Sequence, residues 1–441
     1  MEQGEAWSAR RARDLARGDA RGIFVAVTDA RPASGAPPSG GPLGGAPFAA
    51  KDTLDTRALP TTGNTPALLG THRSRDNPVL SRLIAAGAEL IGKTSTHELA
   101  LGITTSAAAF PACRNPADPE RSPGGSSGGS GAAVAAGIVP FAIGTDTGGS
   151  ISIPAAWCGV FGLRPTTGRW PVGGVVPLSR TRDTVGVIAD SVGRLAAVDA
   201  VAVGDRRPPS DEALRLTSGA RIRIGVPDAD ATFTRRLADP VRRAWEESLD
   251  RLRASGSVTL IRIETEELHE IERRCGHEIE FFEIARELTE YLAGLPRPLR
   301  FGELLEGVAL DEVGEALRES VRAGARSEHY AEALVARSAL QARYDAMFAT
   351  SGVQGLLYPT TPITAPRLGA ERTAELGADE SVFAVGTRNL NPGSVSGQPV
   401  VTLPAAGRDP GRAPVGVSLE GPRHADRGLL RVAGALAEIL R

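Results

Sequence analysis

Serines gathered in two glycine-rich clusters are the residues of this 441-residue chain best suited to do chemistry. The first cluster is Arg121–Gly131 and the second is Gly144–Ser150. A serine hydroxyl becomes a nucleophile when a nearby base removes its proton. Gly/Ser-rich sequence can also be a flexible linker. Here an Ala/Val-rich helical run, 132–136, and a strand-like run, 141–144, lie between the clusters, so we expect both clusters to belong to a packed core.

The second cluster is suited to holding a negative charge. It directly follows the strand-like run, and the N–H groups of Thr147, Gly148, Gly149 and Ser150 could form a concave nest for an oxyanion. Glycine permits the unusual dihedrals and the close approach to a substrate that such a nest requires. Taken alone, the same loop is explained equally well as a plain turn.

A base for the serines is available from only two lysines, Lys51 and Lys93, because the other 48 basic residues are Arg. A guanidinium replaces lysine as a solvated charge, but it does not give up its proton at accessible pH. A lysine buried at a strand end beside uncharged hydroxyls can lose its proton, since desolvation disfavours the cation. The count of residues by itself does not choose between the two lysines.

Two common catalytic patterns match the letters of the sequence but not the expected context. Residues 87–94 read GAELIGKT, which fits a phosphate-binding loop, but they follow a helical pattern and contain a strand-like run, the reverse of that loop's order. Gly124–Gly128 fits the GxSxG nucleophile elbow, which needs a preceding strand, whereas a proline-rich segment precedes it here. We expect neither a nucleotide site nor a Ser–His–Asp triad.

The histidines do not indicate a metal or a triad either. The six show no spacing typical of metal ligands, and no cofactor is predicted. Four of them, His269, His277, His329 and His424, lie in charged helical or turn sequence, so we expect each to be a solvated surface residue.

Charge and hydropathy exclude several classes of protein. With 50 basic and 52 acidic residues, the chain has no field that would attract nucleic acid or an anionic membrane. Its longest apolar run, 132–143, is shorter than the roughly 20 residues of a membrane span, and residues 1–20 lack the apolar core of a secretory signal. The widely spaced cysteines are expected to be buried thiols of a reducing, cytoplasmic compartment. They are Cys113, Cys158 and Cys275.

Strands and helices alternate over residues 47–200, which predicts an α/β sheet covered on both faces. Strand-like runs are 23–28, 47–50, 90–93 and 141–144, helical runs are 9–16, 78–86 and 131–136, and 32–47 is a loop. After a change of composition at 204–220, helices are expected at 239–254, 267–292, 310–322 and 332–348. The last part returns to strands at 356–358, 400–403 and 415–419 and closes with a helix at 429–440.

The stretch Ile261–Glu290 contains ten Glu and four Arg. Such a charge run is usually a solvated helix face. A pocket for a cationic substrate is the lesser alternative.

Four separate blocks, in the same order over more than a hundred residues, resemble the amidase signature family of serine hydrolases. They are 47–52 (PFAAKD), 122–131, 144–150 and 153–165 (IPAAWCGVFGLRP). The resemblance implies one amidase domain over 1–441, an α/β fold with a single large mixed β-sheet covered by helices on both faces. Residues 1–20 would be an N-terminal helical segment, 47–200 the catalytic core, and 205–350 a variable helical region that shapes the substrate pocket.

The resemblance also implies a Ser–cis-Ser–Lys triad without histidine. By motif position Ser150 is the nucleophile, Ser126 the bridging serine and Lys51 the base, and the Gly125–Ser126 peptide is cis. Lys93 would then be a structural lysine at the end of a strand.

Around this triad the resemblance implies an oxyanion hole and a supporting set of hydrogen bonds. The oxyanion hole comprises the N–H groups of Thr147, Gly148 and Gly149. Ser127 and Asp146 would hold the loop and the lysine through hydrogen bonds.

Later blocks are similar to one subgroup, the mandelamide and indoleacetamide hydrolase-like enzymes. They are 171–183, 301–305, 356–362 and 388–394. The implied substrate is a small primary amide with an aryl or apolar acyl group, cleaved to carboxylate and ammonia. The family usually has Arg two residues after the nucleophile, whereas this chain has Ser152, which puts the acceptance of anionic groups in doubt.

Three other functions share the same residues. The acyl-enzyme could pass its acyl group to an amine, the chain could be an amidotransferase subunit that supplies ammonia to a partner, or it could be a scaffold that has lost activity. The intact triad positions argue against the last. The sequence leaves open whether the chain forms a homodimer.

Overall fold

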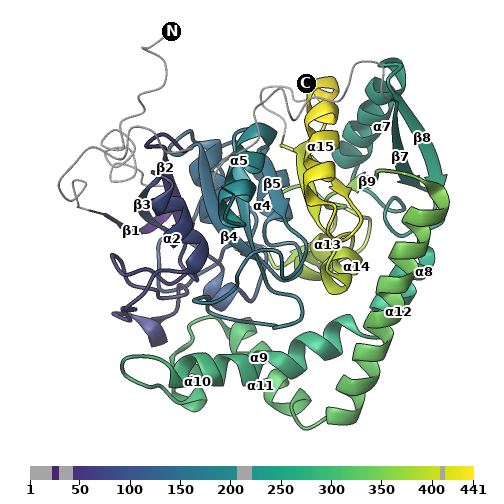
Figure 1. The fold of residues 1–441 in the computed structure, drawn as a ribbon. Helices are drawn as coiled ribbons and strands as arrows, with labels where there is room; N and C mark the ends of the chain where they lie inside the picture. The colour runs from purple at the N-terminus through teal and green to yellow at the C-terminus, as the bar shows by residue number, and fades with distance from the viewer. Residues whose placement is uncertain (1–21, 29–42, 206–220, 408–412) are drawn as a thin grey trace.

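The computed structural model describes residues 22–28, 43–205, 221–407 and 413–441. Within them the backbone forms an eleven-stranded sheet in the order β1-β3-β2-β4-β6-β5-β12-β13-β9-β7-β8, with a separate ribbon β10-β11 (Figure 1). The strands are β1 (Phe24–Val27), β2 (Pro47–Lys51), β3 (Glu89–Thr94), β4 (Phe141–Asp146), β5 (Phe161–Arg164), β6 (Thr184–Ala189), β7 (Ile222–Pro227), β8 (Val258–Ile263), β9 (Gly355–Pro359), β10 (Arg372–Thr373), β11 (Glu380–Ser381), β12 (Val400–Pro404) and β13 (Gly416–Glu420).

The sheet is mixed. β2 runs parallel to both of its neighbours, β3 and β4, whereas β4 and β6 are antiparallel. The α-helices in the described residues are α2 (Pro78–Ala85), α3 (Gly128–Ala135), α4 (Ser152–Cys158), α5 (Val192–Ala202), α7 (Asp239–Ala254), α8 (Glu266–Glu272), α9 (Gly276–Ala293), α10 (Phe301–Gly307), α11 (Asp311–Ala323), α12 (Ser327–Ser351), α13 (Val382–Thr387), α14 (Asn391–Ser396) and α15 (Asp426–Leu440). The predicted fold class is confirmed.

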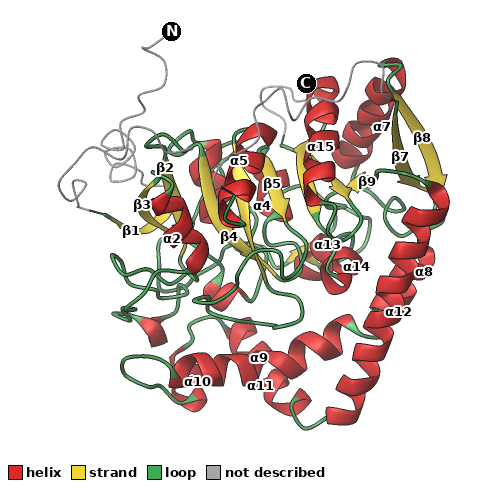
Figure 2. Ribbon diagram, in the orientation of Figure 1, coloured by secondary structure: helices red, strands yellow, loops and turns green. Residues whose placement is uncertain are grey.

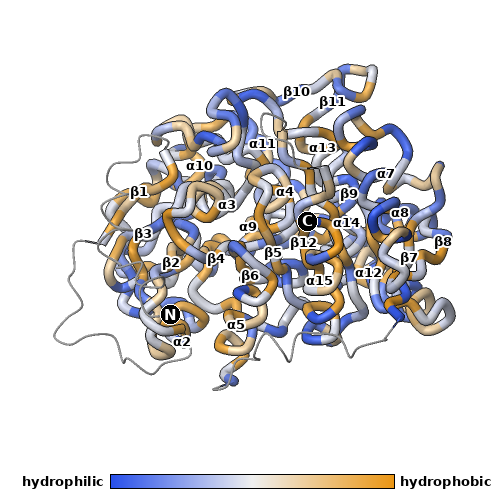
Figure 3. The backbone as a smooth tube through the Cα atoms, turned by 90° about the horizontal axis from the view of Figure 1, so that it is seen from above, coloured by the Kyte–Doolittle hydropathy of each residue, from blue (hydrophilic) through white to orange (hydrophobic). Residues whose placement is uncertain are grey.

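Helices cover both faces of the sheet (Figure 2). On one face α2, α5, α7 and α15 pack on a core that includes Phe48 and Phe141. On the other, α3 and α4 pack on Ala142 and Ile188. Strands β2 and β4 are buried along their whole length, and Figure 3 shows the apolar sequence that runs through this part of the sheet. Strands β2 and β4 are therefore a fully packed base for the loops at their ends.

Local sequence explains where the best predicted helices begin. Asn77 caps α2, because its side chain accepts hydrogen bonds from the N–H groups of Val79 and Leu80, and Pro78 occupies the first turn. Ser191 caps α5 in the same way through the N–H of Arg194. α7 begins and ends where the sequence predicts it, at Asp239 and Ala254.

The region 205–350 differs from the prediction in two respects. It contributes two strands, β7 and β8, to one end of the sheet, where only helices were expected. The single helix predicted at 267–292 is two helices, α8 and α9. The chain turns at 273–275, between the end of α8 at Glu272 and the start of α9 at Gly276, and a glycine near that position weakens a continuous helix. In Figure 1, α9, α10 and α11 lie together at one end of the molecule.

Three predicted features cannot be compared with the fold, because all or most of their residues lie outside the described part of the chain. The predicted helix at 9–16 lies outside the described residues, as do the composition change at 206–220 and most of the loop at 32–47. In the described part of the chain, no helix is both long and apolar enough to cross a membrane.

Candidate active site

The carboxyl ends of β2 and β4 position the residues of the candidate site. The two strands are parallel neighbours, so both lead to the same edge of the sheet, which is where ligands bind in open α/β folds. Lys51 ends β2 and Asp146 ends β4. The predicted bridging serine, Ser126, lies two residues before the start of α3, which packs on one face of the sheet. Three segments far apart in sequence thus meet at one place.

The Lys51 side chain is fully buried and bonded only to hydroxyl groups. Its Nζ donates to Ser126 Oγ at 2.6 Å and to Thr145 Oγ1 at 2.7 Å. Burial lowers the pKa of Lys51 to about 7, against the opposing effect of the Asp146 and Asp183 carboxylates. Near neutral pH a large share of Lys51 is therefore an uncharged amine, which can accept a proton.

The backbone of Ser126 is fixed from both sides. The Gly125–Ser126 peptide is cis. The Ser126 carbonyl accepts the N–H of His97 at 3.1 Å, and the Thr105 hydroxyl donates to the carbonyl of Gly124 at 2.6 Å. Gly124 has φ +83° and its missing Cβ would stand 2.8 Å from Pro154 Cα. Only glycine fits at that position.

Asp146 organises the loop after β4, residues 146–151, which we call the nucleophile loop. Its carboxylate accepts the N–H of Gly149 at 2.9 Å and the N–H of Ile151 at 2.7 Å. Gly149, which the sequence groups with the oxyanion donors, thus uses its N–H inside the loop. The N–H groups of Thr147, Gly148 and Ser150 make no hydrogen bond within the described residues.

The backbone of Ser150 is bonded to Ser127, the residue that follows the predicted bridging serine. Its carbonyl accepts the N–H of Ser127 at 3.3 Å, and the Ser127 hydroxyl donates to the carbonyl of Thr145 at 3.1 Å. Lys51 and Ser126 are completely buried, whereas Ser150 is 8% exposed. Among the described residues, Ser150 Oγ makes no hydrogen bond, so the structure brings Lys51 and Ser126 into direct contact and leaves the Ser150 hydroxyl unpaired.

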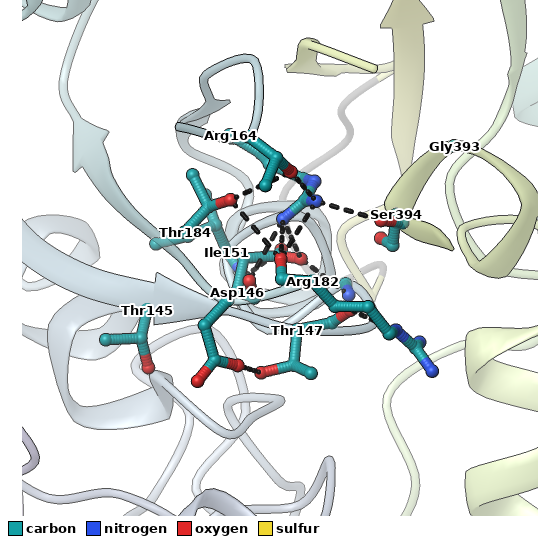
Figure 4. A network of polar contacts seen from close by, with 12 residues as sticks. Thr145, Asp146, Thr147, Ile151, Arg164, Arg182, Thr184, Gly393 and Ser394 are labelled. Atoms are coloured by element: carbon teal, nitrogen blue, oxygen red, sulfur yellow. Dashed lines mark hydrogen bonds and ion pairs between the residues drawn. The ribbon is translucent and has the colours of Figure 1, made fainter. Parts of the chain in front are cut away.

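Two buried arginines surround the nucleophile loop. Figure 4 shows the Arg164 guanidinium beside the nucleophile loop, with Arg182 and Ser394 also close to it. Arg164 forms an ion pair with Asp146 at 3.3 Å and donates to the carbonyls of Asp146, Arg182 and Ser394. The side chain of Arg182 donates to the carbonyl of Thr147 at 3.1 Å. Although Ser152 replaces the family's usual arginine, a buried guanidinium still lies beside this loop.

Thr145, Arg164, Arg182 and Asp183 were not predicted as site residues. Thr147 Oγ1 donates to Asp183 at 2.6 Å, and burial raises the pKa of Asp183 to about 6. All four lie inside blocks used for the resemblance, at 144–150, 153–165 and 171–183. An arginine within an otherwise apolar strand, as in FGLR at 161–164, is the one signal that could have identified a buried charge.

The comparison with known proteins agrees with this geometry. The sequence profile of the amidase family matches residues 25–430. This chain belongs to the amidase family. Indoleacetamide hydrolase of Rhizobium radiobacter is 33% identical over 399 residues, which cover 89% of this chain and 83% of the relative. Mandelamide hydrolase of Pseudomonas putida is 33% identical over 413 residues, covering 89% and 78%. A crystal structure of an amidase matches with a TM-score of 0.78 and 31% identity, covering 98% of this chain and 90% of that one.

This comparison confirms the resemblance that was predicted from the sequence. The relatives include an indoleacetamide hydrolase and a mandelamide hydrolase, which belong to the subgroup that the later sequence blocks resemble. Their similarity supports amide hydrolysis as the class of reaction.

Lys93, the second lysine of this chain, is as buried as Lys51, but its side chain contacts a carboxylate. Its Nζ lies 3.1 Å from Asp52 Oδ1, and it donates to the carbonyl of Pro60 at 3.0 Å and to Thr61 Oγ1 at 3.1 Å. Burial lowers the pKa of Lys93, and the Asp52 carboxylate opposes that shift. These contacts fit the structural role expected from its place at the end of a strand.

The histidine prediction is wrong at His269. This residue is buried, its Nε2 lies 3.2 Å from the carbonyl of Arg388, and its ring meets Phe233 edge-on with centroids 4.4 Å apart. Burial lowers the pKa of His269 to about 4. The charged sequence around it forms the outer face of α8, whereas His269 lies on the inner face. All three cysteines are buried, as expected.

A small cavity of about 140 Å³ opens beside Thr145. Val172, Val175, Pro177 and Val185 supply apolar walls, and the same cavity is bordered by Asp183, Thr184, Arg180 and Glu287. Because Thr145 also accepts a hydrogen bond from Lys51, this cavity is one side chain away from the buried amine.

Proposed function

We propose that this chain hydrolyses the C–N bond of a small primary amide with an aryl or apolar acyl group, through an acyl-enzyme on Ser150. The observation that carries the proposal is the contact between Lys51 Nζ and Ser126 Oγ at 2.6 Å inside a fully buried site. A lysine whose pKa is about 7 and whose hydrogen-bonding partners are hydroxyls is suited to act as a general base.

In the proposed reaction the neutral amine of Lys51 takes the proton of Ser126 while Ser126 takes that of Ser150. The Ser150 oxygen forms a bond with the amide carbon and gives a tetrahedral oxyanion. The proton returns through Ser126 to the amide nitrogen, the C–N bond breaks, and ammonia leaves. Water, activated by the same relay, then attacks the ester and releases the carboxylate and the free Ser150 hydroxyl.

Backbone amides of the nucleophile loop would stabilise the oxyanion. Thr147 and Gly148 are the better candidates, since the N–H of Gly149 is bonded to Asp146. Asp146 and Ser127 act as supports, because between them they bond to β4, to Gly149 and to the backbone of Ser150.

The substrate class rests on two observations. Relatives that are 33% identical are an indoleacetamide hydrolase and a mandelamide hydrolase. The cavity beside Thr145 has apolar walls and a volume of about 140 Å³, and a dry cavity of about 150 Å³ is known to hold benzene. We assign this cavity to the acyl group. Region 205–350, which supplies Glu287 at its border, would help to shape it.

The test is ammonia release from a panel of primary amides, with phenylacetamide and indoleacetamide set against acetamide and a peptide amide. We expect aryl amides to have the highest kcat/KM. A fluorophosphonate probe should label the wild type once and fail to label Ser150→Ala, as read by intact mass. An active Ser150→Ala variant would contradict the acyl-enzyme.

Added hydroxylamine separates hydrolysis from acyl transfer, because an acyltransferase would form hydroxamate faster than carboxylate. Size measurement on the purified protein separates a self-contained amidase, monomer or homodimer, from a subunit that needs a partner. The widely spaced, buried cysteines favour a cytoplasmic location, where thiols stay reduced.

A further inference from the structure

Two successive peptide groups of the nucleophile loop have their carbonyl oxygens bonded to buried arginines. Arg164 Nη1 donates to the carbonyl of Asp146 at 2.9 Å, and Arg182 Nε donates to the carbonyl of Thr147 at 3.1 Å. The two arginine side chains are 1% and 3% exposed. Figure 4 shows both guanidinium groups beside the loop.

A carbonyl that is held in this way also sets the direction of the next N–H group. A trans peptide is planar, and its C=O and N–H point in opposite directions. Within the described residues only the Gly125–Ser126 bond is cis, so both loop peptides are trans. Arg164 therefore orients the N–H of Thr147, and Arg182 orients the N–H of Gly148, each away from its guanidinium.

The remaining amides of the loop are fixed by other means. The N–H of Gly149 is bonded to Asp146. The peptide before Ser150 is held through the carbonyl of Gly149, which accepts the N–H of Ile153 at 2.8 Å in the first turn of α4. Thr147 and Gly148 are thus the two loop residues whose N–H groups have no partner in the described chain and whose orientation depends on side chains.

We propose that Arg164 and Arg182 are positioning residues that aim the N–H groups of Thr147 and Gly148 at the oxyanion. The proposal rests on the function proposed above. Each guanidinium also polarises the peptide that it touches, which strengthens the N–H at the other end of that peptide. Donors that are oriented before the substrate arrives need no reorganisation when the negative charge develops.

The two arginines also connect the loop to distant helices. Arg164 bonds to the backbone carbonyl of Arg182 at 3.2 Å and to that of Ser394 in α14 at 3.1 Å. Arg182 donates to the carbonyl of Gly276 at 3.0 Å and pairs with Glu280, both in α9. Region 205–350 therefore acts on the rate of bond cleavage through Arg182, in addition to its effect on substrate fit.

The experiment compares Arg182→Met and Arg182→Lys with the wild type on one amide that the wild type hydrolyses. We expect Arg182→Met to lower kcat by about tenfold or more, but by less than the roughly 100- to 1,000-fold that is typical of deleting an oxyanion donor. KM should stay unchanged within about twofold. Arg182→Lys retains one donor and should fall between the two. The affinity for an aldehyde analogue, which forms a tetrahedral adduct with Ser150, should drop by the same factor as kcat.

Two variants control for loss of structure. Arg169→Met removes a partly buried arginine that pairs with Asp199 at 2.6 Å and, in the described part of the chain, makes no hydrogen bond or ion pair with the nucleophile loop. This variant should lower the thermal midpoint without changing kcat per folded molecule. Glu280→Gln keeps the Arg182 contact with Thr147 and should change kcat by less than Arg182→Lys does.

The outcomes distinguish this inference from the proposed function. If Arg182→Met keeps its kcat, or raises KM alone, while Ser150→Ala is inactive, the positioning role is wrong and the hydrolase mechanism stands. If the wild type cleaves no amide and is not labelled by the fluorophosphonate probe, both proposals are wrong.

Discussion

The two lysines of this chain occupy equally buried sites on neighbouring strands, yet their surroundings are opposite. Lys51 ends β2 and Lys93 lies on β3, where it is the register partner of Ala50. Lys51 bonds to two hydroxyls, whereas Lys93 pairs with the carboxylate of Asp52. Asp52 follows Lys51 in sequence but turns its side chain toward the other lysine.

The difference teaches how a fold can lower the basicity of one amine until its neutral form can accept a proton, and give another amine an anionic partner. Burial disfavours the cation at both sites. At Lys93 an anion in contact compensates for the lost hydration, while at Lys51 the hydroxyls offer hydrogen bonds but no charge. The surroundings of Lys51 therefore suit a proton acceptor, and those of Lys93 suit a structural ion pair.

Lys51→Met tests the first half of the comparison and should have the largest effect. Removing a general base typically costs about 100- to 10,000-fold in rate, so kcat/KM for a primary amide should fall by that order. The protein should remain folded, because no carboxylate loses a contacting partner. Ammonia release and circular dichroism measure the two quantities. Near-normal turnover would exclude Lys51 as the base.

Lys93→Met tests the second half and should act on stability. Breaking a buried ion pair by removing one partner costs about 3–5 kcal/mol, because Asp52 would be left charged and unpaired. Urea unfolding measures the loss of free energy of unfolding. The double variant Lys93→Met/Asp52→Asn should recover part of it. Unchanged stability in the single variant would show that the Asp52 pair is not what Lys93 contributes.

The pH dependence of activity should report the lowered pKa of Lys51, about 7. Only the neutral amine accepts a proton, so kcat/KM should fall about tenfold per pH unit below that value and level off above it. Asp183, whose pKa is raised to about 6, lies nearby, and Asp183→Asn separates the two titrations. A rate that stays constant down to pH 5 would contradict a lysine base.

Stability should show the same titration with a definite sign. The folded pKa of Lys51 lies below the unfolded value of 10.5, so between about pH 7 and 10.5 the unfolded chain binds more protons. The contribution of Lys51 to the free energy of unfolding therefore rises with pH over that interval. Subtracting the same curve for Lys51→Met isolates it, and a flat difference would mean that Lys51 is charged in the folded state.

Thr145→Val should have the smallest effect. It removes one of the two hydrogen bonds of Lys51 at nearly constant volume, and a single hydrogen bond contributes about 0.5–1.5 kcal/mol, or roughly 2- to 10-fold in kcat. Loss of an acceptor that favours the ammonium should also move the acidic limb of the pH profile to lower pH. An unchanged profile would mean that Thr145 does not tune Lys51.

Much of the fold could be predicted because local signals agree with it. The strand at 141–144 and the capped helix at 78–86 combine apolar periodicity with clear ends, and both are present within a residue or two. The strands β7 and β8 were missed, since they lie in a region whose composition favours helices. The turn that separates α8 from α9, at 273–275, was missed because the helical pattern of the sequence continues through it.

The candidate site divides in the same way. The sequence motifs predicted Lys51, Ser126 and Ser150 as the triad and a cis peptide before Ser126; the structure has that cis peptide and places Lys51 against Ser126. They did not identify Thr145 or Arg182, because nothing in their own sequence neighbourhood says that a hydroxyl will face an amine or that a guanidinium will reach a loop carbonyl. His269 was misjudged for the same reason, as its neighbours are charged but its own position faces inward.

The sequence by itself determined the inventory: only two lysines, two serine-rich clusters of which the second follows a predicted strand, and the order of motifs that identifies the family. Tertiary structure decided how these groups are used. Which lysine receives the Asp52 carboxylate, which N–H groups of the loop stay unbonded, and which arginines hold their peptides all depend on contacts between segments far apart in the chain. Burial and charge pairing set proton affinity, and both are properties of the folded molecule.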